Sequence, residues 1–509
     1  MAAVIELKGI TKRFPGVLAN DHIDLTINEQ EVFAIVGENG AGKTTLMNII
    51  YGLYQPDSGK IIIKGKERRI SGPGDAIALG IGMVHQHFML IPVFTVAENV
   101  VLGTEPTKYG GYLDLERARR EVKEFSEKFG MKIDPDARVE HISVGMQQRV
   151  EIIKALFRGA DILILDEPTA ALTPLETQEL FETIRSLKAQ GKTVIFISHK
   201  LQEVLTIADR IAVLRNGKAV GVVDAKSATT TQLARMMVGR DVILEYEKAP
   251  PRLGDVLLEA HNLVAQNDRG VTTVKGVSFH LRSGEILGIA GVEGNGQTEL
   301  VEVLTGLRAP LSGEIRIKGK PFFRPDAKSL RRSGMAHIPA DRHKLGLVLP
   351  FNVAENLILG MHNLPPFARG NGLNREAIEE FAQSKVLEFD IRPHDYKIKA
   401  NKLSGGNQQK VIVAREISSK PEIMIASQPT RGLDVGATEF VHKQLLEERD
   451  KGKAVLLVSL ELDEILSLSD RIAVMYGGEI VAAFDSREAT EEEIGLCMLG
   501  AKRQEHVYV

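Results

Sequence analysis

One sequence module occurs twice in this chain of 509 residues, and the duplication constrains the fold more than any other feature. The glycine-rich string GENGAGKTT at residues 37–45 is followed 254 residues later by GVEGNGQTE at residues 291–299. Further along, ILDEPTAALT and DRIAV recur as IASQPTRGLD and DRIAV, both 261 residues later. A nearly constant spacing of this length predicts two homologous domains and excludes a solenoid of short repeats.

Composition and charge remove several other classes of protein. The hydrophobic content of 43% and charged content of 26% are typical of a globular chain, and the length fits about two to four domains. The net charge of −3 offers no electrostatic basis for binding nucleic acid, so we expect no nucleic-acid partner. The single cysteine, Cys497, excludes an intramolecular disulfide and a zinc site built from cysteines. A reducing compartment is therefore the simplest setting.

No segment of the sequence predicts a signal peptide or a membrane span. The first ten residues, MAAVIELKGI, lack the charged start and the long apolar stretch of a signal peptide. No run of about 18 apolar residues, the length that a spanning helix needs, occurs anywhere. We therefore expect any association with a membrane to be peripheral.

Unbroken apolar runs alternate with helix-like segments in both halves, which predicts an α/β fold with a parallel sheet covered on both faces. The adjacent prolines Pro250 and Pro251 disfavour helix and sheet interiors and mark residues 246–254 as a linker. The predicted domains are therefore residues 1–245 and 255–509. The apolar runs are 32–36, 162–165, 193–197, 286–290, 423–426 and 454–458, and the main helix-like segments are 44–51, 115–129, 297–304 and 375–389.

The first glycine-rich string has the pattern of a phosphate-binding loop. Its glycines let the backbone curl so that its N–H groups face a phosphate, and the following helix adds its positive end. Lys43 is then placed to reach the β- and γ-phosphate oxygens, and the Thr44 hydroxyl to bind Mg²⁺. The nucleotide-contacting residues predicted from this loop are Gly37, Glu38, Asn39, Gly40, Ala41, Gly42, Lys43, Thr44 and Thr45.

Two carboxylates end an apolar run in the same half. Asp166 and Glu167 follow the run LIL at residues 163–165. With a phosphate loop upstream, Asp166 would hold Mg²⁺ and Glu167 would polarise the attacking water. The alternative is a strand that simply ends in a solvated acidic turn.

Other candidates are weaker when taken singly. His199 could contact the γ-phosphate, Gln86 could reach the metal, and Phe14 could stack on a nucleotide base, but each is also typical of an ordinary loop residue. The string LSGGNQQ at residues 403–409 places a serine and two glycines at a helix start. It indicates either a second anion cradle or a plain capped helix.

Taken in order, these strings resemble the ATP-binding subunits of ABC transporters over nearly the whole chain. The resemblance implies two tandem P-loop (RecA-like) nucleotide-binding domains, each with a helical subdomain that carries a signature motif. It further implies ATP and Mg²⁺ as cofactors, and two domains facing head to tail. Each ATP would then lie between the phosphate loop of one domain and the signature of the other.

By this resemblance, one composite site is complete. Its catalytic residues would be Glu167, His199, Gln86 and Lys43, its metal ligands Thr44, Gln86 and Asp166, and its base-stacking residue Phe14. The second half would contribute Ser404, Gly405, Gly406 and Asp434.

The other composite site has lost its functional groups. Asp268, Gln297, Ile338, Ser427, Gln428 and Leu460 take the places of Phe14, Lys43, Gln86, Asp166, Glu167 and His199. Its signature would be the divergent ISVGM at residues 142–146, with Thr173 in place of Asp434. All losses fall on one site, so we predict one live ATPase site. With Gln297 in place of a lysine, the second loop loses a charge-assisted hydrogen bond to the nucleotide, which is worth about 1.5–3 kcal/mol. A loss of this size weakens nucleotide binding but leaves open whether the second site retains nucleotide.

Within the ABC family, the chain looks like the tandem ATPases of simple-sugar and nucleoside importers. The string MVHQHFML at residues 83–90 is closer to the nucleoside importers. The resemblance implies two membrane permease subunits as partners, with an extracytoplasmic solute-binding protein as an indirect one. It places the chain at the cytoplasmic face of the membrane, without direct contact with the solute. Residues 88–92 and 337–351 would form the grooves for the permeases.

The main alternative is a soluble tandem ABC ATPase that acts on ribosomes. Such proteins usually keep both phosphate loops intact and join them by a long charged helical linker, whereas Gln297 breaks the second loop and the joint is short. A DNA-repair ABC ATPase conflicts with the near-neutral charge, and a small GTPase with the absence of an Asn-Lys-x-Asp string.

Overall fold

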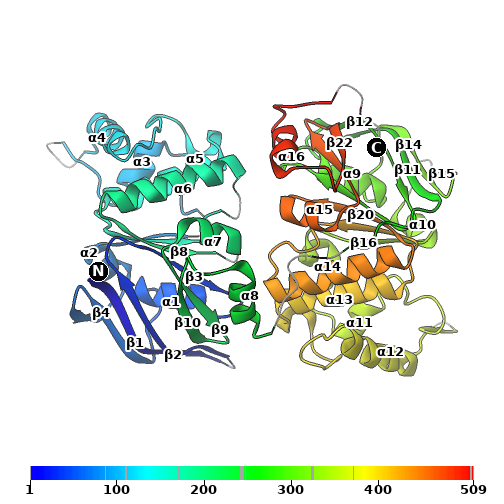
Figure 1. Ribbon diagram of the computed structural model, residues 1–509, viewed down its shortest axis with the longest axis horizontal. Helices are drawn as coiled ribbons and strands as arrows, with labels where there is room; N and C mark the ends of the chain where they lie inside the picture. Colours follow the sequence, from blue (N-terminus) through cyan, green and yellow to red (C-terminus); the bar gives the residue numbers. More distant parts are fainter. Residues whose placement is uncertain are drawn as a thin grey trace. The chain divides into compact units, whose positions relative to one another are not determined.

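The computed structural model describes two compact units, Met1–Val242 and Ile243–Val509 (Figure 1). It describes the chain except residues 1, 16, 86–87, 109–111, 170–171, 173, 199, 241–245, 247, 323–325, 371, 505–506 and 508, and only the backbone at 174–175. Residues 246–254 fall in the second unit. There Lys248 Nζ donates to the Ser469 carbonyl at 2.7 Å, and Arg449 Nη2 donates to the Ala249 carbonyl at 3.0 Å. The role of this segment as a linker stays a prediction.

The central sheet of the first unit has the strand order β10-β9-β3-β8-β7-β6. Strands β3, β6, β7, β8 and β9 pair in parallel, and β10 joins β9 antiparallel. Every residue of β3, β7 and β8 is buried, as expected for strands covered on both faces. The strands are β3 (Val32–Gly37), β6 (Ile81–Val84), β7 (Ile162–Asp166), β8 (Thr193–Ile197), β9 (Arg210–Arg215) and β10 (Lys218–Asp224).

A second, antiparallel sheet has the order β2-β1-β4-β5. The sequence patterns predict short strands at residues 4–7 and 60–64, which overlap β1 and β4, but not their antiparallel pairing. Its strands alternate buried and exposed residues, and the buried face packs on α1 (Lys43–Ile50) and on the central sheet. The phosphate loop therefore lies between β3 and α1, a helix that packs against both sheets. The strands are β1 (Ala3–Phe14), β2 (Val17–Asn28), β4 (Ser58–Ile63) and β5 (Lys66–Arg68).

The helical subdomain of this unit is formed by α3, α4 and α5, which pack on one another and lie at the end of the unit away from β1, β2 and β4 (Figure 1). The charge-rich segment predicted as a helix is α4, and its Asp114 caps the first turn. The helices are α2 (Pro73–Ala78), α3 (Val96–Val101), α4 (Leu115–Lys128), η1 (Val139–His141), α5 (Val144–Phe157), α6 (Pro174–Ala189), α7 (Leu201–Ile207) and α8 (Thr230–Val238).

The second unit repeats this architecture, which confirms the predicted α/β class with two P-loop units. Its sheets have the orders β16-β19-β20-β13-β21-β22 and β12-β11-β14-β15. The strands are β11 (Val256–Gln266), β12 (Thr272–Arg282), β13 (Glu285–Ala290), β14 (Ser312–Ile317), β15 (Lys320–Phe322), β16 (Met335–Ile338), β19 (Ile423–Ser427), β20 (Ala454–Ser459), β21 (Arg471–Tyr476) and β22 (Glu479–Asp485), with the short β17 (Ala368–Arg369) and β18 (Gly372–Leu373) apart.

The helices of the second unit also match those of the first. Helices α5 and α13 have equal lengths and start 261 residues apart, and so do α6 and α14. The helices are α9 (Gln297–Leu304), α10 (Ala327–Arg332), η2 (Arg342–Gly346), α11 (Val353–Leu357), α12 (Arg375–Glu388), η3 (Ala400–Lys402), α13 (Gly405–Ser418), α14 (Val435–Asp450), α15 (Leu462–Leu468) and α16 (Glu491–Met498).

Strand register corrects one of the correspondences drawn from the sequence. Ile81 of β6 pairs with Ile162, and Met335 of β16 pairs with Ile423, the counterpart of Ile162. The counterpart of Ile81 is therefore Met335, which makes Ala340, and not Ile338, the counterpart of Gln86. The correction leaves the loss of a polar side chain at this position unchanged.

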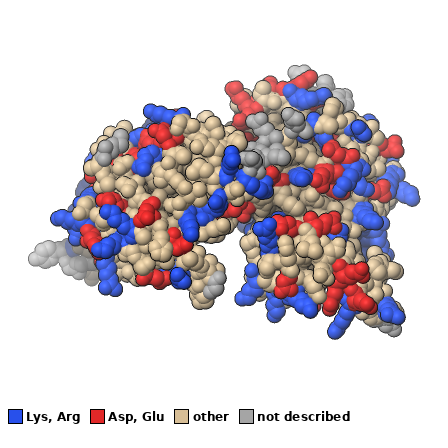
Figure 2. Space-filling view, turned by 60° about the horizontal axis from the view of Figure 1, so that its bottom comes forward, with Lys and Arg blue, Asp and Glu red and all other residues tan. Residues whose placement is uncertain are grey.

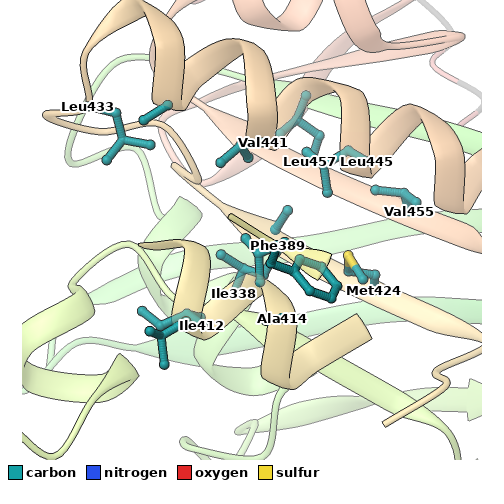
Figure 3. Packing of buried hydrophobic residues seen from close by; sticks show 14 of the residues in the cluster. Ile338, Phe389, Ile412, Ala414, Met424, Leu433, Val441, Leu445, Val455 and Leu457 are labelled. Carbon is teal, nitrogen blue, oxygen red and sulfur yellow. The ribbon is translucent and has the colours of Figure 1, made fainter. Parts of the chain in front are cut away.

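The core of the second unit shows how the elements that carry function are anchored (Figure 3). Val441 and Leu445 of α14 point toward Val455 and Leu457 of β20, and all four are essentially buried. Leu433, directly before α14, belongs to the same cluster. The start of α14 is therefore fixed by apolar packing on the sheet.

Candidate functional site

The phosphate loop of the first unit has a geometry that only glycine supports. Gly40 and Gly42 have φ of 83° and 97°, in the left-handed region. A Cβ at Gly42 would lie 2.1 Å from the Ala19 carbonyl oxygen. The Asn20 side chain also donates to the Gly42 carbonyl at 3.1 Å, which ties the loop to β2. The loop is thus a preformed backbone cradle.

Lys43 closes this cradle with a positive charge. Its Nζ donates to the Gly37 carbonyl at 2.6 Å and to the Glu38 carbonyl at 3.1 Å, and only 6% of the side chain is exposed. Phosphate oxygens can replace these carbonyl acceptors without moving the lysine far. The arrangement suits a bound polyphosphate.

Thr44 and Asp166 form the pair that fits Mg²⁺. The Thr44 hydroxyl is hydrogen-bonded to the Asp166 carboxyl at the end of β7. Burial and the adjacent Glu167 charge raise the pKa of Asp166 to about 6, while Lys43 and Thr44 oppose the shift. In the described part of the chain no cluster of three or more metal-ligating His, Cys, Asp or Glu side chains occurs. Mg²⁺ in nucleotide sites characteristically takes only one or two protein oxygens together with phosphates, so the pair fits.

Glu167, the residue directly after Asp166, has a strained backbone conformation. Its φ is 47°, and its amide donates to the Ile197 carbonyl of β8 at 2.9 Å. A non-glycine residue at positive φ costs of order 1–3 kcal/mol, so the surrounding sheet must impose it. Gln428 repeats this conformation, with φ of 42° and a 2.7 Å bond to the Val458 carbonyl. At this position the second unit has the same backbone conformation, and an amide replaces the carboxylate.

Phe14 belongs to an aromatic pair that sequence reasoning only half found. Its ring lies 5.4 Å from that of Tyr54 in an edge arrangement, and Phe14 is 36% exposed. An exposed aromatic surface of this kind suits base stacking. In the second unit the two counterparts, Asp268 and Arg308, form an ion pair of 2.7 Å. Both aromatic residues are replaced by charged residues 254 positions later in the chain, and this joint replacement is the sequence signal that could have identified Tyr54.

The second phosphate loop keeps its shape. Gly296 has φ of 98°, and a Cβ there would lie 2.1 Å from the Thr273 carbonyl oxygen. Gln297, only 6% exposed, donates from Nε2 to the Val292 carbonyl at 3.1 Å. A neutral amide therefore occupies the place of the lysine ammonium, so the loop has lost charge while its backbone is unchanged.

The predicted signature and the following aspartate meet within the second unit. Ser404 caps α13 by accepting hydrogen bonds from Asn407, at 2.9 Å from Nδ2 and 3.5 Å from the amide. Asp434 caps α14 by accepting from the Ala437 amide at 2.8 Å. Its other carboxylate oxygen would lie 3.8 Å from a Cβ at Gly406. Ser404, Gly405, Gly406 and Asp434 thus share one surface.

Some of the predicted residues lie outside the described residues. Gln86, His199 and Thr173 belong to this group. The structure brings together Lys43, Thr44, Asp166 and Glu167 in the first unit, and the signature residues in the second. The roles of all these side chains remain predictions.

Two P-loop units, each with an antiparallel sheet and a helical subdomain, define a tandem nucleotide-binding protein. The sequence profile of the ABC transporter family matches residues 20–170 and 274–431. The chain belongs to this family.

Curated relatives match this chain over nearly its whole length. A guanosine import ATP-binding protein of Bacillus subtilis is 49% identical, and a nucleoside import ATP-binding protein of Lactococcus lactis is 48% identical, each with 99% of both chains covered. A glucose import ATP-binding protein of Haloferax volcanii is 44% identical over 97% of this chain and 96% of its own.

A solved structure of an archaeal ribosome recycling factor, in complex with a ribosomal stalk protein, also matches. It has a TM-score of 0.63 and 20% identity, and covers 98% of this chain and 94% of its own. Identity at this level shows a common fold alone. The ribosome alternative therefore gains no support from this likeness.

Proposed function

We propose that this chain is the ATPase subunit of an ABC importer, and that the imported solute is a nucleoside rather than a sugar. The ATPase assignment rests on the side chains of Lys43, Thr44, Asp166 and Glu167. The first two follow a loop whose backbone only glycine permits, and the last two lie at the strained end of β7. The full-length likeness to import ATP-binding proteins supports the transport role. Nucleosides are favoured because the two nucleoside relatives have the higher identities.

The chemistry of the proposed reaction is electrostatic positioning. Lys43 and the loop amides bind the β- and γ-phosphates, and Glu167 accepts a hydrogen bond from the attacking water. Thr44 and Asp166 would hold Mg²⁺, and the ion would supply charge neutralisation for the phosphoryl oxygens. Gln86 and His199 would complete the set around the γ-phosphate.

The signature of the second unit would complete the live site. In this proposal Ser404, Gly405, Gly406 and Asp434 face the nucleotide bound by the first phosphate loop, as the ABC family resemblance implies. ATP then joins the two units, and its hydrolysis releases them. The replacement of charged residues by Gln297 in the second loop, and by Ser427 and Gln428 at the end of β19, supports a single turnover site.

Two permease subunits are the proposed membrane partners, with the chain at the cytoplasmic face. Each unit has a cavity beside the segment predicted to contact them, of about 140 Å³ in the first unit and 220 Å³ in the second. Met89 lines the first cavity and is 64% exposed, while His337 and Leu345 line the second. Of the helices in the described part of the chain, none combines the length and apolar character that a membrane crossing needs.

The surface charges are consistent with this assignment. On the face shown in Figure 2, basic and acidic side chains are interspersed over each unit. A single-sign basic face of the kind that nucleic-acid-binding proteins present is not seen in that view. In this proposal an extracytoplasmic binding protein binds the solute, and this chain does not contact it.

The decisive experiment is equilibrium binding of a panel of nucleosides, pentoses and hexoses to the solute-binding protein that co-purifies with the assembled transporter. Tight binding of a nucleoside is expected. Sugar binding would contradict the solute assignment and leave the ATPase assignment intact. Co-purification with ribosomes in place of membrane proteins would contradict the transport role.

A further inference from the structure

The two signature helices begin in different electrostatic surroundings. Helices α5 and α13 are counterparts, and each starts beside the first turn of a second pair of counterparts, α6 and α14. Residue 176 in the first turn of α6 corresponds to residue 437 in α14, since the helices are offset by 261 residues. The first is a glutamate and the second an alanine.

In the first unit, Glu176 covers the start of α5. The Ser143 hydroxyl donates to Glu176 Oε1 at 3.4 Å. A Cβ at Gly145 would lie 2.5 Å from the same oxygen, and all three of the atoms nearest to that point belong to Glu176. A helix start attracts anions through its unpaired N–H groups and its dipole. Here a carboxylate of the unit itself lies at that position.

In the second unit, the Ala437 methyl takes the place of the Glu176 side chain, and a carboxylate oxygen, Asp434 Oδ2, lies farther off, 3.8 Å from a Cβ at Gly406. The Ala437 Cβ would lie 3.0 Å from a Cβ at Gly406. Among the described residues, the Ser404 hydroxyl accepts bonds from Asn407 and donates to no carboxylate. Its proton is thus available to an incoming anion.

A cation also stands beside the second signature. Arg342 Nη2 would lie 2.8 Å from a Cβ at Gly405, and its Nη1 donates to the Arg431 carbonyl at 3.0 Å. Burial lowers the pKa of Arg342, but a guanidinium remains charged at neutral pH. The start of α13 therefore has a guanidinium beside it and the Asp434 carboxylate at a longer distance, while the start of α5 has the Glu176 carboxylate in direct contact.

We propose that the residue at this shared position decides which signature accepts a triphosphate. Glu176 occupies the anion position at α5 and repels the γ-phosphate, whereas Ala437 leaves the position at α13 vacant beside Arg342. The inference rests on the proposed function, in which each signature faces the phosphate loop of the other unit. It adds a cause of the single live site that is independent of the losses at Gln297, Ser427 and Gln428.

The proposal is tested by giving the second signature the side chain found at the first. A charged and a neutral side chain of equal length separate the effect of charge from that of size. Ala437→Glu places the carboxylate of the first unit at the live signature, and Ala437→Gln places a neutral side chain of the same length there. ATP turnover and its KM are measured on the purified transporter complex, with the melting temperature of each variant. We expect Ala437→Glu to lower kcat/KM at least about tenfold, as for loss of a charge-assisted contact, and Ala437→Gln to lower it less than about threefold.

The outcomes separate the inference from the proposed function. Equal activities of the two variants at equal melting temperatures would overturn the inference, while turnover by the unmodified complex would still support the ATPase. Absence of ATP turnover in the unmodified complex would instead contradict the proposed function. A raised KM in Ala437→Glu that salt relieves would support repulsion of the nucleotide over a packing defect.

The first unit offers the converse test. In a Gln297→Lys background, which restores the loop cation of the second unit, Glu176→Gln should raise the stoichiometry of bound labelled ATP from one toward two per chain. With Glu176 retained, the stoichiometry should stay near one. An unchanged stoichiometry on removal of the charge would overturn the exclusion by Glu176.

Discussion

The two units of this chain have the same backbone at their nucleotide sites but differ in the charges that the backbone carries. Gly42 and Gly296 share a left-handed conformation that other residues rarely adopt, and Glu167 and Gln428 share a strained one. Yet the lysine, aspartate and glutamate of the first unit are all replaced by neutral residues in the second. The backbone conformation of the two loops is thus the same, while the charges that would act on a nucleotide are present in the first unit and absent from the second.

The largest expected effect comes from the carboxylate that distinguishes Glu167 from Gln428. Glu167→Gln should leave ATP binding intact and lower turnover by about 10²–10⁴, because the attacking water loses its hydrogen-bond acceptor. Steady-state phosphate release, with nucleotide binding measured in parallel, checks this. The converse variant Gln428→Glu is the control and should leave total turnover where it was. Normal hydrolysis by Glu167→Gln would mean that the second unit is also active.

A second prediction sets the two signatures against each other. Ser404→Arg should abolish most hydrolysis, by at least about a hundredfold, because a bulky cation would displace the nucleotide from an interface that tolerates little overpacking. Ser143→Arg, at the matching position of α5, should have little effect on turnover. Melting temperatures of both variants control for misfolding. The reverse ranking of activities would refute the head-to-tail pairing.

The third prediction concerns the loop cations. Lys43→Gln, which copies Gln297, should weaken ATP binding about 10–100-fold, the value of a charge-assisted hydrogen bond. Gln297→Lys alone should create no second turnover site, since Ser427 and Gln428 remain, and with Glu176 retained the bound ATP should stay near one per chain. Equilibrium dialysis with labelled ATP, together with turnover, measures both. A doubled turnover in Gln297→Lys would show that the loop cation was the only missing group.

The smallest expected effect is a pH dependence from Asp166, which the second unit replaces by Ser427. Because the pKa of Asp166 is raised to about 6, the folded chain holds a proton there between about pH 4 and 6 that the unfolded chain releases. The stability contributed by this proton is present below about pH 4 and is lost as the pH rises through about 6. Only the ionised carboxylate binds Mg²⁺.

Affinity for MgATP should therefore fall about tenfold between pH 7.5 and pH 5, in proportion to the ionised fraction of Asp166. Titration calorimetry at both pH values measures this. Asp166→Asn should bind more weakly and lack that part of the pH dependence, which separates it from protonation of ATP itself. An equal pH dependence in the variant would rule out Asp166 as its source.

Local sequence pattern was sufficient wherever function depends on residues that are neighbours in the chain. The phosphate loop, the strand ending in Asp166 and the charge-rich helix α4 were all predictable, because glycine conformation, apolar runs and helix caps act over a few residues. The pairing of β1, β2 and β4 into an antiparallel sheet was not predicted. Its partners lie tens of residues apart, and the turn signals between them were not interpreted as hairpins.

The duplication served as an internal comparison, and its errors are instructive. The alignment of Gln86 with Ile338 was wrong, since pairing of β16 with β19 makes Ala340 the counterpart. The spacing of 254 residues that relates Phe14 to Asp268 and Lys43 to Gln297 gives the same answer, so the sequence already held this information. The prediction that the second half lacks a polar side chain at this position stands, because both Ile338 and Ala340 lack one.

The sequence by itself determined that this chain has two phosphate-loop units and that Lys43, Asp166 and Glu167 of the first are replaced by neutral residues in the second. The tertiary structure alone decided which distant side chains surround each group. It paired Phe14 with Tyr54 and, in the other unit, Asp268 with Arg308; it also brought Glu176 over the start of α5, 33 residues from Ser143. The physical reason is that charge and conformation belong to single residues, whereas electrostatic surroundings arise only when separate helices and strands pack together.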